Sequence, residues 1–355
     1  MAVNNHVRDS VAGAKARPSS VVAYSGAHPA HQKMFAGCCA ESIKMLGDWS
    51  TDEPVSSKEK LRAYLSTARR LRSSAHTAIV IEGTTPAVLM APFIKLLNHR
   101  KKSIIVLSAD DALYRAFIAD RGFKAVFTRF GFRYIDGVIA IGGLVAELAK
   151  KHVRQLPIDV RFPEISEARQ ESLAMLAPSV NSHTMLLIGG RDAHYKGVDI
   201  AVSCFKILQK RIPDARLIVI GFPELTTAEG IEWPGPVKDI IPYLSSSSVL
   251  IHPGRGDSFP VAVLEAALAG VTPFVSEWTG NASLLRNIDP ELVAPLDPEE
   301  FANRIATFWE SSPEHRQELS AKCKKAAMEY VEEIANQPSL APFIEHIAHI
   351  NKSRG

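Results

Sequence analysis

The feature that most constrains the fold of this chain is the regular alternation of short apolar runs with helix-length segments along its 355 residues. Many of the runs, such as TAIVIEG and ARLIVIG, are almost continuously apolar and end in glycine. Runs of this kind are typical of strands buried on both faces, as in parallel sheets covered by helices. The sequence therefore predicts an α/β protein with parallel sheets and crossover helices.

The runs fall into two groups of five. We expect strands over 20–26, 77–83, 103–109, 137–141 and 158–162 in the first half, and over 184–190, 215–221, 247–254, 271–277 and 291–296 in the second. Between residues 25 and 77 no second strand is recognisable, which predicts an abbreviated first sheet. Because 355 residues exceed one ordinary core, we expect two doubly wound, Rossmann-like domains facing each other across a cleft.

The expected division of the chain follows from these runs. It comprises a disordered lead-in over 1–18, an N-terminal domain over 19–165, a linker over 166–183, a C-terminal domain over 184–335 and a helix over 336–355. Whether this last helix returns to the N-terminal domain is left open. The polar N-terminus lacks the apolar centre of a secretory signal, and no run reaches the ~18 apolar residues of a membrane span, which favours a cytoplasmic protein.

The charge is unevenly distributed between the two halves. Residues 1–165 carry 24 Lys and Arg against 14 Asp and Glu, a net +10, whereas residues 166–355 carry 17 against 24, a net −7. A basic half indicates an anionic partner, and a peripheral location on the inner face of a membrane is one alternative. A basic surface without a membrane role is the other. No nucleic-acid-binding motif is present, so nucleic acid is not expected as a partner.

Metal binding is also not expected. The four cysteines have no metal-ligand spacing and include the adjacent pair Cys38 and Cys39. This usage fits a reducing compartment and argues against a structural zinc site.

Ligands of doubly wound sheets bind beyond the carboxyl ends of the strands, so the loops there are the candidate sites. The first such loop of the second half contains Gly189, Gly190, Arg191 and Lys196 ahead of a predicted helix. Glycines allow close backbone approach, and an Arg fork, a Lys charge and a helix N-terminus all favour the same anion. The loop therefore predicts a diphosphate site, with ordinary surface charges as the alternative.

A second candidate is Glu265, the only charged residue between Val261 and Gly270. Pro260 suits a first helical turn, and Gly270 suits a left-handed cap that ends the helix. A carboxylate in so apolar a helix needs a partner, because an unpaired buried charge is unfavourable. The partner is either an internal cation or a ligand.

Three segments together carry a family resemblance. In order and spacing, GGRDAHYKGVDIAV, PGPVKDIIPYLSSSSVLIHPG and DSFPVAVLEAALAGVTPFVSEWTGN resemble the donor-binding domain of retaining glycosyltransferases of GT-B architecture, glycosyltransferase family 4. The resemblance implies transfer of a sugar from a UDP- or GDP-linked donor, with retention, to the hydroxyl of a lipid-linked, glycan or small-molecule acceptor. It implies no metal and no cofactor beyond the nucleotide sugar itself.

The resemblance also implies roles for single residues. Arg191 and Lys196 would hold the donor diphosphate. Asp257 stands where the family usually has Glu and would hold the sugar hydroxyls, and Glu265 would hold the ribose. The remaining donor-binding residues would be Gly189, Gly190, Pro236, Val237, Ser258, Phe259, Pro260 and Val261.

The first half departs from the family pattern. Where the family often has a His at a strand end, this chain has Ala109, followed by Asp110. We expect Asp110, His28 and His31 on the acceptor side of the cleft, with ordinary loop histidines as the alternative. Two other functions remain open: a nucleotide-sugar epimerase, and a catalytically silent GT-B subunit that binds a sugar nucleotide or a partner.

Overall fold

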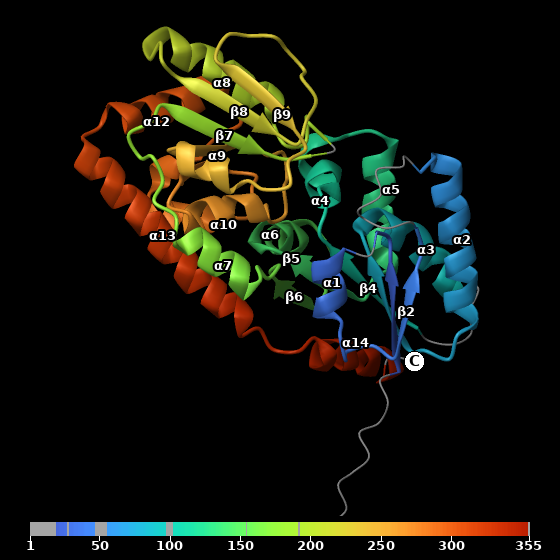
Figure 1. Ribbon diagram of the computed structural model, residues 1–355. Helices are drawn as coiled ribbons and strands as arrows, with labels where there is room; N and C mark the ends of the chain where they lie inside the picture. The colour runs from blue at the N-terminus through green and yellow to red at the C-terminus, as the bar shows by residue number, and fades with distance from the viewer. Residues whose placement is uncertain are drawn as a thin grey trace, which may run out of the picture.

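The computed structural model describes residues 19–26, 28–46, 55–96, 102–153, 155–190 and 192–353. The lead-in over 1–18, for which disorder was expected, lies outside the described residues. The described chain forms two lobes, each built on one six-stranded sheet (Figure 1). All strand pairs in both sheets are parallel. The predicted α/β class with two parallel sheets is confirmed.

The first sheet has the order β2-β1-β3-β4-β5-β6. Its strands are β1 (Ser20–Tyr24), β2 (Glu41–Lys44), β3 (Ala78–Glu82), β4 (Ser103–Ser108), β5 (Gly137–Ile141) and β6 (Ile158–Arg161). The four inner strands are buried along their whole length, as continuous apolar runs require.

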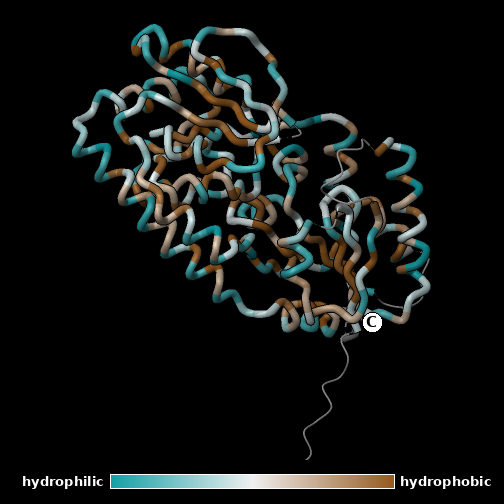
Figure 2. The backbone as a smooth tube through the Cα atoms, viewed as in Figure 1, coloured by the Kyte–Doolittle hydropathy of each residue, from teal (hydrophilic) through white to brown (hydrophobic). Residues whose placement is uncertain are grey.

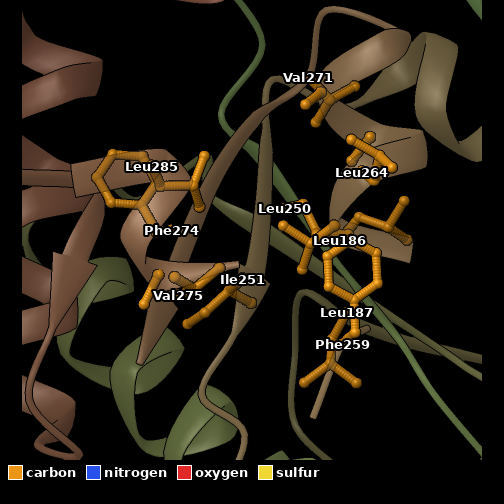
Figure 3. Packing of buried hydrophobic residues seen from close by; sticks show 14 of the residues in the cluster. Leu186, Leu187, Leu250, Ile251, Phe259, Leu264, Val271, Phe274, Val275 and Leu285 are labelled. Carbon is orange, nitrogen blue, oxygen red and sulfur yellow. The ribbon is translucent and has the colours of Figure 1, made fainter. Parts of the chain in front are cut away.

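The second sheet has the order β12-β11-β10-β7-β8-β9. Its strands are β7 (Thr184–Ile188), β8 (Arg216–Ile220), β9 (Ile231–Gly235), β10 (Val249–His252), β11 (Thr272–Ser276) and β12 (Val293–Ala294). In Figure 3, Leu250 and Ile251 of β10 lie among the buried side chains of this core, with Phe274 of β11 and Leu264 of helix α10 (Val261–Leu268) nearby. In Figure 2, the apolar stretches of the tube gather in the inner strands of both lobes.

Two strands were not predicted, and the expectation of an abbreviated first sheet was wrong. β2 and β9 each form the edge of a sheet. Only Ile43 of β2 is buried, and β9 is at most half-buried and contains Pro234. An edge strand has one neighbour and partial cover, so it does not need the continuous apolar run on which the prediction relied.

Helices cover both faces of the sheets. They are α1 (Pro29–Met34), α2 (Ser57–Ser73), α3 (Thr84–Leu96), α4 (Ala112–Tyr114), α5 (Phe123–Gly131), α6 (Gly143–His152), α7 (Glu167–Ala174), α8 (Val198–Arg211), α9 (Ile241–Ser246), α10 (Val261–Leu268), α11 (Ala282–Ile288), α12 (Pro298–Glu310), α13 (Pro313–Ala335) and α14 (Ala341–Ser353). Short helical turns of other types cover Arg115–Ala119, Phe132–Tyr134 and Pro290–Leu292. None of the described helices combines the length and apolar character that crossing a membrane requires.

The chain crosses between the lobes twice. Helix α7 lies in the segment expected as a linker, and the long helix α13 descends along the second lobe to α14, which lies beneath the first (Figure 1). The Ser103 hydroxyl donates to the carbonyl oxygen of Ile347, and the Ile347 side chain packs at Gly137. The C-terminal helix therefore covers the amino ends of β4 and β5.

Helix α5 packs on α3 through small residues. Ala125 and Gly131 are buried, and a Cβ on Gly131 would lie 2.4 Å from Cβ of Val88 in α3. Such a distance is below any normal carbon–carbon contact, so the two helices approach each other as closely as a glycine allows.

We expect Gly131→Ala to lower the free energy of unfolding by about 1–3 kcal/mol, because the added methyl group must displace Val88 or the helix. Gly122→Ala is the matched control, since a Cβ there meets nothing within 4 Å and its φ is −76°. Urea unfolding of both variants measures the difference. Equal stability of the two variants would contradict the close packing of α5 on α3.

Candidate active site

The two lobes touch through the loops that follow their strands. The Ser258 hydroxyl, from the loop after β10, donates to the carbonyl oxygen of Ala109 after β4, at 2.8 Å. Gly142, after β5, has φ +86°, and a Cβ there would lie 2.3 Å from the carbonyl oxygen of Ser258. The carboxyl ends of the two sheets therefore face each other, which is where doubly wound folds bind ligands.

Two groups of aromatic side chains pack at this junction. Tyr114 of α4 packs on Trp278, with ring centroids 5.1 Å apart, and against Gly256, where a Cβ would lie 2.4 Å from Cβ of Tyr114. Phe259 lies within 6.0 Å of both Phe162 and Tyr330, measured between ring centroids. The predicted donor residue Phe259 thus has a packing role and is buried.

The centre of the candidate site is the carboxylate of Asp257, which is only 5% exposed. Its Oδ2 accepts from Nζ of Lys196 at 2.6 Å and lies 2.9 Å from Nε2 of His252. The Tyr195 hydroxyl donates to Oδ1 at 3.3 Å. The structure therefore brings together two of the predicted residues, Lys196 and Asp257, and adds His252 and Tyr195, which the sequence analysis did not select.

The protonation states in this cluster follow from burial and charge. Burial by itself would raise the pKa of Asp257, but Lys196 and His252 outweigh it and hold this pKa below its usual range. Burial lowers the pKa of His252, so its ring is neutral and donates through Nε2–H. Burial, and then the charge of Asp257, raises the pKa of Tyr195, which keeps its hydroxyl protonated. A buried ion pair is thus completed by two neutral donors.

A second ion pair fixes the loops around the cluster. Arg255 donates from both terminal nitrogens to the carboxylate of Asp199, each at 2.8 Å, and from one of them to the carbonyl oxygen of His194 at 2.6 Å. Gly197 at the start of α8 has φ +72°, and a Cβ there would lie 2.0 Å from the carbonyl oxygen of Pro253. The loops after β7 and β10 therefore form one unit beside the N-terminus of α8.

The remaining predicted diphosphate residues lie in the loop after β7. Gly189 and Gly190 follow the strand directly, and a Cβ on Gly189 would lie 2.6 Å from the ring of Phe222. Arg191 lies outside the described residues. Pro236 and Val237 lie between β9 and α9, at the same carboxyl edge of the sheet.

Across the junction, the first lobe presents carboxylates. Asp110 accepts hydrogen bonds from the Thr84 amide at 3.0 Å and the Thr84 hydroxyl at 2.8 Å, yet burial raises its pKa. Burial, and then the charge of Asp110, raises the pKa of the neighbouring Asp111 to about 6, against the opposing charge of Arg115. The charge of Asp192 contributes to this rise, so the acidic turn after β4 faces the loop after β7.

The two predicted loop histidines have different roles. His28 precedes α1 and accepts from the Ala30 amide through Nδ1 at 3.2 Å, so it caps that helix. Nδ1 of His31 lies 2.5 Å from the carboxylate of Glu82, the last residue of β3, and Glu82 also accepts from the amide of Gly26 at 2.9 Å. His31 and Glu82 form a pair at the strand ends of the first lobe.

Glu265 has a protein partner. Nε of Arg169 in α7 donates to its carboxylate at 2.8 Å, and the two side chains are 28% and 17% exposed. The internal ion pair given as the alternative is therefore present in the structure. Glu265 lies one turn after Val261 on the partly exposed face of α10, and Pro260 directly precedes the first residue of this helix.

Some of the residues that sequence reasoning missed carried a recognisable signal. His252 and Glu82 are the last residues of buried strands, and Tyr195 directly precedes Lys196. Arg169 carried none, because nothing in the local sequence of α7 indicates a contact with α10. Within the described ranges, no group of three or more His, Cys, Asp or Glu side chains could hold a metal ion.

We expect the buried His252 to make stability depend on pH. Its pKa is lowered in the folded state, so the unfolded chain binds the extra proton, and stability is lost as the pH falls below the ordinary value of about 6.5. The loss approaches about 1.4 kcal/mol per pH unit and should be smaller in His252→Gln. Urea unfolding of both proteins from neutral pH downward measures this. Identical pH dependence would contradict a neutral buried imidazole.

Comparison with known proteins finds matches to glycosyltransferases. A family model described as "Glycosyl transferases group 1" matches residues 182–311. A curated relative from Campylobacter jejuni, N,N'-diacetylbacillosaminyl-diphospho-undecaprenol alpha-1,3-N-acetylgalactosaminyltransferase, is 22% identical in an alignment of 284 residues that covers 69% of this chain and 74% of the relative.

Solved structures agree on the fold. Sucrose-phosphate synthase from Thermosynechococcus elongatus superposes with a TM-score of 0.65 at 13% identity, covering 95% of this chain and 100% of that one. HepE of Anabaena, solved in complex with UDP-glucose, gives a TM-score of 0.61 at 13% identity and covers 94% and 99%. The chain is a glycosyltransferase of GT-B architecture, and residues 182–311 of its second lobe match the glycosyl transferases group 1 model.

Proposed function

We propose that this glycosyltransferase transfers a sugar from a nucleoside-diphosphate sugar to an acceptor hydroxyl with retention of the anomeric configuration. The observation that supports this best is the cluster of Lys196, Asp257 and His252 beside the N-terminus of α8, at the junction of the lobes. Two relatives add support, since one was solved with UDP-glucose and the other is named for an α-linked transfer to a diphospho-undecaprenol acceptor.

In this proposal the donor diphosphate lies at the N-terminus of α8. The Gly190 amide and amides at the start of α8 supply donors, and Lys196 supplies the charge. The Gly189 amide donates to the carbonyl oxygen of Ile220 instead, and Gly189 contributes by allowing close approach of the backbone. Arg191 is proposed to add a second cation. Asp257 holds Lys196 in place and accepts from a hydroxyl of the donor sugar.

The transfer breaks the bond between the anomeric carbon and the diphosphate oxygen. The acceptor oxygen forms its bond to that carbon on the same face, and its proton passes to the leaving phosphate oxygen. Lys196 and the α8 amides stabilise the negative charge that grows on the phosphate. No metal and no cofactor enter this assignment.

The acceptor is proposed to bind the first lobe, where Asp110, Asp111 and the pair of His31 and Glu82 line the strand ends. The net charge of +10 over residues 1–165 favours an anionic acceptor or surface. We propose a lipid-linked acceptor at the inner face of a membrane, reached by a peripherally bound cytoplasmic enzyme.

The nucleoside is proposed to bind along the second lobe. Glu265 accepts from the ribose hydroxyls, and the main chain at Pro236 and Val237 meets the base, with uracil or guanine as the candidates. Ser258, Pro260 and Val261 complete the donor site between the cluster and the ribose.

A panel of UDP, GDP, ADP and their sugars tests the donor proposal by thermal shift, since a ligand at about 100 times its Kd adds about 2.7 kcal/mol to stability. We expect Lys196→Met to weaken binding of the matching nucleoside diphosphate and to lower the transfer rate about 100-fold or more. Lys210→Met, an exposed change at the other end of α8, is the control. Full activity of Lys196→Met would remove the diphosphate assignment.

A second comparison separates the two roles of Glu265. If its carboxylate holds the ribose, Glu265→Gln should weaken nucleotide binding about tenfold or more, because hydrogen bonds to charged groups contribute about 1.5–3 kcal/mol. Arg169→Gln removes the same ion pair but keeps the carboxylate, so it should bind nucleotide normally. Calorimetric titration measures both. Equal losses in the two variants, or none in either, would leave Glu265 with a structural role alone.

A further inference from the structure

Helix α5 carries its large apolar side chains on the solvent side. Phe123, Val126, Phe127 and Phe130 are 81%, 53%, 36% and 47% exposed. Their spacing of three, four and seven positions places them on one face of the helix. The buried positions are instead Ala125 and Gly131, and Gly131 packs against Val88 of α3. Packing within the lobe therefore covers the four large side chains only in part.

Cations surround this stripe. Arg121, Lys124, Arg129 and Arg133 are all exposed, and residues 121–135 contain no Asp or Glu. The Arg133 guanidinium lies over the Phe130 ring, 5.2 Å from its centroid. We call Phe123, Val126, Phe127 and Phe130, with the cations Arg121, Lys124 and Arg133, the α5 face.

A groove of about 320 Å³ lies under the α5 face, between α3 and α5. Its walls are mostly apolar, and its lining residues are Thr85, Val88, Leu89, Phe123, Lys124, Phe127 and Thr128. Thr85 directly follows Thr84, which holds Asp110 at the acceptor side of the site. The groove therefore begins one residue away from the proposed acceptor region, and in Figure 1 α5 lies on the side of α4 that faces away from the second lobe.

We propose that the α5 face docks the enzyme onto an anionic lipid bilayer, with the groove accepting the end of an acyl or polyprenyl chain. This inference rests on the proposed function only in taking the acceptor to be lipid-linked. Aromatic side chains ringed by cations are favourable at the boundary of headgroups and acyl chains, where the rings leave water and the cations meet phosphate. A second copy of the chain fits less well, because a symmetric contact would place like cations opposite each other.

The double variant Phe123→Ser/Phe127→Ser tests the proposal by sedimentation with vesicles. We expect the wild-type chain to bind vesicles of equal parts phosphatidylglycerol and phosphatidylcholine, and binding to decrease as salt shortens the Debye length toward about 8 Å. The double variant should bind at least about tenfold more weakly. Lys124→Gln/Arg133→Gln should reduce binding to anionic vesicles and flatten the salt dependence. Met175→Ser, an equally exposed apolar side chain in the crossover after α7, is the matched control.

Three outcomes would overturn the proposal: no vesicle binding by the wild-type chain at low salt, equal binding by the double variant, or an equal loss in Met175→Ser. Concentration-dependent dimerisation that only the double variant abolishes would assign the face to a second copy instead. The nucleotide panel is independent of α5, so the double variant should keep nucleoside-diphosphate binding. If no nucleotide or nucleotide sugar of the panel binds but the chain still binds vesicles, the donor proposal is wrong and the docking proposal is unaffected.

Discussion

The carboxylate of Asp257 is the group on which the candidate site depends. A buried charge is tolerated only with compensation, and three groups supply it: Lys196, His252 and Tyr195. They come from the loops after β7 and β10, which the pair of Arg255 and Asp199 ties to the start of α8. The buried carboxylate must be paired and hydrogen-bonded. The contacts that meet this need also fix Lys196, the N-terminus of α8 and the ends of β7 and β10 relative to one another.

Close backbone contact sets how the lobes meet. A side chain on Gly142 or Gly256 would collide with the opposite lobe, and one on Gly280 would collide with Ser258 within the second lobe. The Ser258 hydroxyl adds a direct hydrogen bond across the junction to the backbone at Ala109, the position where the family often has a His. In this chain, contact with the second lobe thus takes place at the position of that His, and the titratable groups lie at the next two positions, Asp110 and Asp111.

The first lobe has a net positive charge and contains α5, a helix that buries small residues and exposes large apolar ones. Small residues of α5 face inward because the contact with α3 leaves no room for larger ones, and its aromatic residues face water. This arrangement gives the lobe that is proposed to bind the acceptor an apolar and cationic surface, which connects the charge asymmetry of the sequence to a particular helix.

The sequence by itself determined the parallel α/β class, the inner strands and the loops that carry the candidate site, because buried parallel strands require continuous apolar runs and their loops meet at one edge. It did not determine the edge strands β2 and β9, whose partial cover leaves no such run. Only the tertiary structure decided the partners of Glu265 and Asp257, since Arg169 and Lys196 lie 96 and 61 positions away along the chain. Burial and ion pairing depend on which residues are neighbours in space. The apolar periodicity along a helix or strand indicates only which of its faces is covered.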